Sequence, residues 1–215
     1  MLFGILPNAC YPLGQRDCRA AFETPELDEP GQAGETSLPR LFTGLEIPAD
    51  IALALSRYRG GLPGARWAEP ENYHVTLRFI GDIDDGLARD VFSVLGDGRR
   101  RGPLGVSLDR LASFGGDRPR ALFARIEPAP DLQDLQAEQE RLMRRVGLAP
   151  EKRKFTPHVT LARLRDTSPE DVAHYIATHG HFPRLTFTAS RYVLYSAKES
   201  TGGGPYVVEA AYPLA

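Results

Sequence analysis

The chain has 215 residues, of which 42% are hydrophobic and 25% charged, and its formal net charge is −2. This composition is that of a soluble globular protein with one large domain or two small lobes. The near-neutral charge argues against sequence-independent binding to nucleic acid, and no apolar run approaches the roughly 20 residues of a membrane helix. Both cysteines, Cys10 and Cys18, lie in the first twenty residues. Neither a disulfide framework nor a thiolate metal cluster is therefore expected beyond them, which fits a cytoplasmic protein.

The first 39 residues differ in pattern from the rest. They contain five prolines, and their acidic residues follow neither a helix nor a strand period. This pattern is typical of a disordered extension. We therefore predict a disordered segment over residues 1–39 and a folded domain over residues 40–215.

In the rest of the chain, apolar residues recur with strand and helix periods. Helices are predicted after Pro48, Asp82, Asp131 and Ser168, where apolar residues are spaced by three or four; N-terminal signals mark the first, third and fourth of them. Strands are predicted where β-branched and aromatic residues are enriched; they cover residues 41–47, 73–80, 104–114, 118–126, 159–164, 186–188, 191–196 and 206–212. This order predicts an α+β fold with mostly antiparallel sheets, arranged as two similar lobes with outer helices around a central cleft.

One tetrapeptide, His-Val-Thr-Leu, occurs at residues 74–77 and again 84 residues later at residues 158–161. Each copy begins a predicted strand. Because strand side chains alternate between faces, the histidine and threonine of each copy share one face, and the valine and leucine share the other. A single His-x-Thr pattern is more often an ordinary half-buried strand than a site. Two copies with identical apolar neighbours favour a functional interpretation.

The doubled motif favours phosphoryl chemistry. His74 and His158 could act together as acid and base near neutral pH, and Thr76 and Thr160 could donate to non-bridging phosphoryl oxygens. A metal site is the main alternative for paired histidines. However, metal sites usually include carboxylate or thiolate ligands, and neither copy has one beside it. No acyl-transfer nucleophile motif, Walker motif or dinucleotide-binding glycine pattern is present.

The chain resembles the 2H phosphoesterases, and within them the RNA 2′,3′-cyclic phosphodiesterases that are also called 2′-5′ RNA ligases. The two His-Val-Thr-Leu motifs are similar to those of the family. Further matching stretches are residues 40–42, 71–81, 114–115, 118–123, 157–163 and 194–196. Together they span about residues 40–213, whereas the first 39 residues lie outside the family pattern.

The resemblance implies hydrolysis of 2′,3′-cyclic phosphate ends of RNA or nucleotides to 2′-phosphomonoesters, with no metal, no cofactor and no membrane. It implies that His74 is the proton donor, that His158 is the proton acceptor and that Thr76 and Thr160 bind the phosphate. It also places Arg163 near the phosphate, although strict alternation from His158 would turn Arg163 away unless the strand bulges. A monomer is expected.

Three alternatives remain open from the sequence. The substrate could be a non-RNA cyclic phosphate such as ADP-ribose cyclic phosphate, or the chain could bind RNA ends without turnover. The basic run at residues 99–101 could contact RNA phosphates, although such runs are more often solvated turns.

Overall fold

The computed structural model describes residues 38–179, 181–197 and 204–214, all within one compact unit that comprises residues 35–215. The helices are α1 (Ala49–Ser56), the short 3₁₀ helix η1 (Pro70–Asn72), α2 (Asp85–Gly96), α3 (Pro130–Arg145) and α4 (Pro169–Thr178). The strands are β1 (Leu38–Glu46), β2 (Ala65–Trp67), β3 (His74–Ile83), β4 (Leu104–Phe114), β5 (Ala121–Ile126), β6 (His158–Leu164), β7 (Leu185–Ala189), β8 (Arg191–Ala197) and β9 (Tyr206–Pro213).

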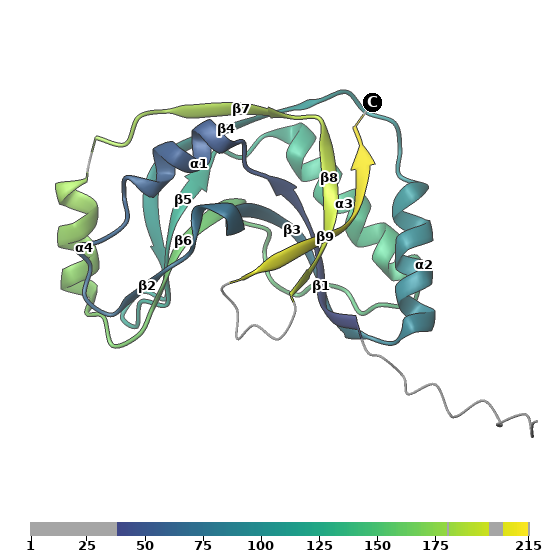
Figure 1. The fold of residues 1–215 in the computed structure, drawn as a ribbon, viewed down its shortest axis with the longest axis horizontal. Coiled ribbons are helices and arrows are strands. Elements are labelled where there is room, and N and C mark those ends of the chain that lie inside the picture. Colours follow the sequence, from purple (N-terminus) through teal and green to yellow (C-terminus); the bar gives the residue numbers. More distant parts are fainter. Residues whose placement is uncertain (1–37, 180, 198–203, 215) are drawn as a thin grey trace, which may run out of the picture. The chain divides into compact units, whose positions relative to one another are not determined.

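The strands form one sheet in the order β7-β4-β5-β6-β3-β1-β8-β9, with β2 paired to β6. Every pairing is antiparallel. The two strands that carry the histidine motifs lie side by side at the middle of the order (Figure 1) and are paired at one position, Val75 opposite Val159. The sheet therefore consists of two halves that are joined through β3 and β6: β7-β4-β5-β6 with the short β2, and β3-β1-β8-β9.

The predicted α+β class with antiparallel pairing is confirmed, and three details differ. The two predicted sheets are one sheet, because β3 pairs with β6. The halves do not follow chain order, since β8 and β9 from the end of the chain pair with β1, while β4 and β5 pair with β7 and β6. The short strand β2 and the helix η1 were not predicted, because three residues give too little periodicity to identify an element.

The helices bury the apolar face of this sheet. Helix α3 packs against β3, α2 against β9, α1 against β7 and α4 against β4 (Figure 1). Two polar contacts fix α3 to the sheet: Arg78 of β3 pairs with Glu140, and the Thr43 hydroxyl of β1 donates to Gln139. Fully buried leucines from strands and helices fill one core, and each stabilises the fold by about 1.5–3 kcal/mol; they include Leu41, Leu45, Leu55, Leu108, Leu122, Leu132 and Leu161.

The predicted disordered extension lies outside the described residues, except that β1 already begins at Leu38, two residues before the expected start at Arg40. Cys10 and Cys18 also lie outside them. Within the part of the chain that the structure describes, no helix is long and apolar enough to cross a membrane.

Candidate active site

The junction of the two halves brings the two histidine motifs together. With Val75 opposite Val159 in an antiparallel pair, the register places His74 opposite Thr160 and Thr76 opposite His158. Both valines are fully buried on the core face, whereas the two histidines and two threonines are partly exposed on the other face. The side-chain alternation predicted from the sequence therefore brings all four polar side chains to one place on the sheet.

A β-bulge interrupts each histidine strand at the same position of the motif. In β3, Thr76 and Arg78 pair with consecutive residues of β1, which leaves Leu77 as the extra residue. In β6, Thr160 and Ala162 pair with consecutive residues of β5, which leaves Leu161 extra. The leucine and the residue after it are buried in both strands, so the alternation shifts by one at this point.

The bulge resolves the orientation of Arg163. A regular strand would turn it away from His158, but the shift at Leu161 returns it to the histidine face. Its guanidinium accordingly lies near enough to His74 and Tyr206 for its charge to lower the pKa of both side chains. The structure thus brings a cation to the same face as both imidazoles.

Helix η1 and the aromatic side chains of three strands surround His74. Its Nδ1 donates to the backbone carbonyl of Asn72 at 2.8 Å. The rings of Phe42 and Tyr206 lie 4.9 Å from the imidazole, and that of Tyr195 lies 5.6 Å away. The pKa of His74 is lowered from 6.5 to about 4, mainly by burial among these rings and also by the charges of His158 and Arg163, against the hydrogen bond to Asn72. His74 is therefore neutral at pH 7 in the unliganded protein.

His158 has a similar environment in the other half. Its Nδ1 donates to the backbone carbonyl of Thr156 at 2.7 Å. Phe114 lies edge-on at 4.9 Å from the imidazole, and Phe123 at 5.1 Å. Burial lowers the pKa of His158 below 6.5, and the hydrogen bond to Thr156 partly opposes this shift.

Both imidazoles are oriented for proton transfer at the same nitrogen. Because each Nδ1–H is donated to a carbonyl, each neutral ring keeps its lone pair on Nε2. Among the described residues, the hydroxyls of Thr76 and Thr160 have no hydrogen-bond partner, so both are available to a ligand. The arrangement provides two proton-transfer groups, two hydroxyl donors and one guanidinium on a single face, a set suited to an anionic phosphoryl group.

Several residues of this site were missed by sequence reasoning. Tyr206 and Tyr195 come from the last two strands, and their approach to His74 depends on pairing between distant parts of the chain. Gly44, opposite Thr76, lets β1 pass close to Tyr195: a Cβ there would lie 2.8 Å from the backbone oxygen of Val75 and 3.3 Å from the Tyr195 ring. The sequence signal for this close approach is Gly44 itself, because a glycine inside a predicted strand often marks a place where another segment comes close.

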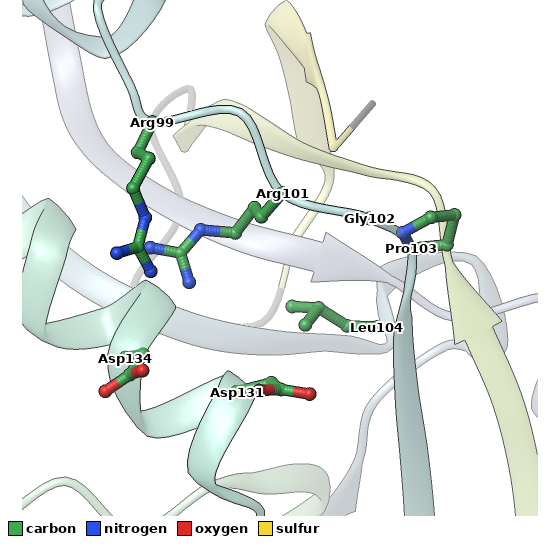
Figure 2. A pocket seen from close by; sticks show the side chains of 7 residues that line it. All are labelled: Arg99, Arg101, Gly102, Pro103, Leu104, Asp131 and Asp134. Atoms are coloured by element: carbon green, nitrogen blue, oxygen red, sulfur yellow. The ribbon is translucent and has the colours of Figure 1, made fainter.

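The basic run at residues 99–101 lies outside the candidate active site. Arg99 and Arg101 border a crevice of about 210 Å³ above helix α3, together with Asp131 and Asp134 (Figure 2). Neither histidine lines this crevice. Arg101 is largely buried in an ion pair with Glu138, whose other oxygen accepts from the backbone N–H of Arg99. These contacts fix the loop before β4 to α3, and Glu138 neutralises the charge of Arg101.

The fold and the site together define a class of protein. Two antiparallel halves that each contribute one His-x-Thr strand to a common face form the two-histidine phosphoesterase architecture. The chain belongs to the 2′-5′ RNA ligase superfamily, whose family model matches residues 47–201.

Known proteins of similar sequence and structure agree with this family. The chain is 36% identical over 107 residues to the RNA 2′,3′-cyclic phosphodiesterase of Aeropyrum pernix, a match that covers 49% of this chain and 60% of that protein. It is also 36% identical over 104 residues to the protein of the same name from Aquifex aeolicus, and this match covers 46% of this chain and 55% of that protein. The matched regions thus cover only a little over half of these relatives.

The solved structures show the same fold at lower identity. TT0787 of Thermus thermophilus has a TM-score of 0.68 at 21% identity, and the match covers 81% of this chain and 97% of that chain. E. coli LigT complexed with 3′-AMP has a TM-score of 0.66 at 21% identity, and the match covers 82% of this chain and 98% of that chain.

Proposed function

We propose that the protein hydrolyses 2′,3′-cyclic phosphate ends of RNA or nucleotides to 2′-phosphomonoesters. The observation that carries this proposal is the pairing of Val75 with Val159, because it sets both His-x-Thr pairs on one face of the sheet. The names of the two relatives from Aeropyrum pernix and Aquifex aeolicus support the substrate class.

In the proposed reaction, water attacks phosphorus while the bond from phosphorus to the 3′-oxygen breaks. His158 accepts the water proton at Nε2, and His74 donates a proton from its Nε2 to the departing 3′-oxygen. The product carries the phosphate on its 2′-oxygen, and proton exchange with solvent restores both imidazoles. An in-line displacement has water and leaving oxygen on opposite sides of phosphorus, so two separate groups are needed for the two protons.

The donor role of His74 requires the substrate itself. The pKa of His74 is lowered to about 4 in the unliganded protein, mainly by burial. A bound phosphodiester carries a negative charge, and an opposite charge within a few ångströms raises the pKa of an imidazole. Substrate binding would therefore favour the protonated form of His74, which can donate its proton.

Thr76, Thr160 and Arg163 are assigned to the non-bridging phosphoryl oxygens. Both hydroxyls have no intramolecular partner in the described part of the chain, and Arg163 supplies the positive charge on this face. Donors aimed at the position where charge develops stabilise the transition state more than the ground state.

The test is turnover of 2′,3′-cyclic nucleotides and of RNA with a cyclic end, with identification of the phosphomonoester isomer. Each of His74→Ala and His158→Ala should lower the rate by about 10²–10⁴-fold, the usual contribution of acid–base catalysis. His181→Ala, which removes an exposed histidine beyond α4, is the matched control. Binding of the RNA end without turnover, or turnover of ADP-ribose cyclic phosphate alone, would overturn the proposal.

The same variants separate the two proton-transfer roles. A nitrophenyl phosphodiester has a leaving group that needs no proton. Activity on it should recover in His74→Ala and stay low in His158→Ala. The opposite pattern would exchange the two roles, and full activity of either variant on the cyclic substrate would remove that histidine from the mechanism.

A further inference from the structure

Tyr206, at the start of strand β9, contacts the candidate site and has no role in the reaction as proposed above. Its ring meets the His74 imidazole edge-on, with centroids 4.9 Å apart and planes at 81°. The same ring lies 5.1 Å from Phe42 at 84°. Tyr206 thus forms part of the wall around the proposed proton donor.

Among the described residues no hydrogen bond is donated by the phenol of Tyr206, so its proton is available to another partner. Arg163 and the backbone of Gly204 lie near enough to the phenol oxygen to lower the pKa of Tyr206. Burial raises the pKa of Tyr206, against the charge of the nearby Arg163, so the phenol stays protonated near neutral pH. A protonated phenol can donate its single proton to an anion.

Asn72 holds Tyr206 and His74 in a fixed relation. Its backbone carbonyl accepts from Nδ1 of His74 at 2.8 Å, and its side-chain Oδ1 accepts from the backbone N–H of Tyr206 at 3.2 Å. Gly204 makes this approach possible: its φ is +85°, and a Cβ there would overlap the Asn72 side chain. The position of the phenol is therefore set before any ligand binds.

The other half of the sheet separates the packing role of this ring from its hydroxyl. Phe114 meets His158 edge-on with centroids 4.9 Å apart and planes at 82°, which matches the geometry of Tyr206 against His74. A phenylalanine is thus sufficient for packing beside a motif histidine. The hydroxyl of Tyr206 is the feature that packing leaves unexplained.

We propose that Tyr206 is a substrate-binding residue whose O–H donates to a non-bridging phosphoryl oxygen beside Arg163. The inference rests on the function proposed above, since it assigns a further contact in the same site. A neutral donor has an advantage at this position. The charge of Arg163 already lowers the pKa of His74, and a second cation would oppose its protonation further, whereas a phenol binds the anion without adding charge.

The test compares Tyr206→Phe, which keeps the ring, with Tyr212→Phe as a matched control on the same strand. The Tyr212 hydroxyl donates to the backbone oxygen of Phe92 at 3.2 Å, outside the site. Hydrolysis of 2′,3′-cyclic AMP gives kcat and KM, and calorimetric titration with inorganic phosphate measures anion binding directly. Tyr206→Phe should lower kcat/KM and phosphate affinity by about 10- to 100-fold, the usual effect of losing a donor to a charged group. The control should keep wild-type values.

NMR titration, together with these two measurements, separates the possible outcomes. NMR titration of His74 should give the same pKa in Tyr206→Phe and wild type, because the ring that buries the imidazole remains; a shifted pKa would indicate a structural effect and overturn the proposal. Wild-type phosphate affinity in Tyr206→Phe, or no phosphate binding by the wild type, would also overturn it. If the wild type fails to hydrolyse the cyclic substrate, the proposed function is wrong. Selective loss of phosphate affinity in Tyr206→Phe would then still support the contact.

Discussion

Lowering the pH should destabilise the folded protein through His74. The pKa of this imidazole is about 4 in the folded protein and 6.5 for the free side chain, and burial is the main cause. A histidine whose pKa is lowered by folding binds its proton more readily in the unfolded chain. Stability is therefore unaffected well above pH 6.5 and falls as the pH drops from about 6.5 towards 4.

The expected size follows from this difference in pKa. One pKa unit corresponds to about 1.4 kcal/mol, so the shift of His74 lowers the free energy of unfolding by about 2 kcal/mol at pH 5 and about 3 kcal/mol at pH 4. Because His74 keeps some exposure on the open face of the sheet, water screens part of the effect, and these values are upper limits. Such a loss is a large fraction of the stability of an ordinary domain.

Urea unfolding of the wild type and of His74→Gln at pH 7, 6 and 5 measures this contribution. Glutamine does not titrate, so the difference between the two pH dependences isolates His74 from every other group. The wild type should lose about 1–2 kcal/mol more than the variant between pH 7 and pH 5. Inorganic phosphate should reduce that excess loss, since a bound anion raises the pKa of the imidazole. Equal pH dependences for wild type and variant would refute a lowered pKa of His74.

Four further predictions concern catalysis and stability. The pKa values of both His74 and His158 are lowered in the unliganded protein, so kcat/KM should peak below neutral pH and fall as the pH rises. The kcat, which reports the enzyme–substrate complex, should remain high to a higher pH. Identical pH profiles for kcat/KM and kcat would contradict this prediction. A chelator should leave the rate unchanged, because no cluster of three metal-binding side chains occurs among the described residues; activity that disappears with a bound metal would contradict the mechanism. Arg78→Met should lower the free energy of unfolding by about 3–5 kcal/mol in urea titrations, since it leaves Glu140 without its largely buried partner. In the control, the Arg78→Met/Glu140→Leu double variant, the free energy of unfolding should fall by less. Removal of residues 1–34 should leave the melting temperature and turnover nearly unchanged, and a large loss of either would show that this segment contributes to the fold or the site.

The site could be predicted from the sequence as far as local rules apply. Two copies of His-Val-Thr-Leu identify the residues, and strand alternation assigns their histidines and threonines to one face. The same rule turns Arg163 away from His158, but alternation holds only along an unbroken register. The bulge at Leu161 returns Arg163 to the histidine face, and nothing in the tetrapeptide itself predicts that bulge.

The α+β class, the antiparallel strands and the paired motif were determined by the sequence alone, because they follow from side-chain periodicity over a few residues. The tertiary structure decided which strands pair. It places β8 and β9 in the half of the sheet that contains β1, and it joins the halves at one residue pair between β3 and β6. Tyr206 consequently reaches His74 from a point in the chain more than a hundred residues away. Such contacts depend on the summed burial and hydrogen bonding of whole strands, a non-local free energy that no short stretch of sequence contains.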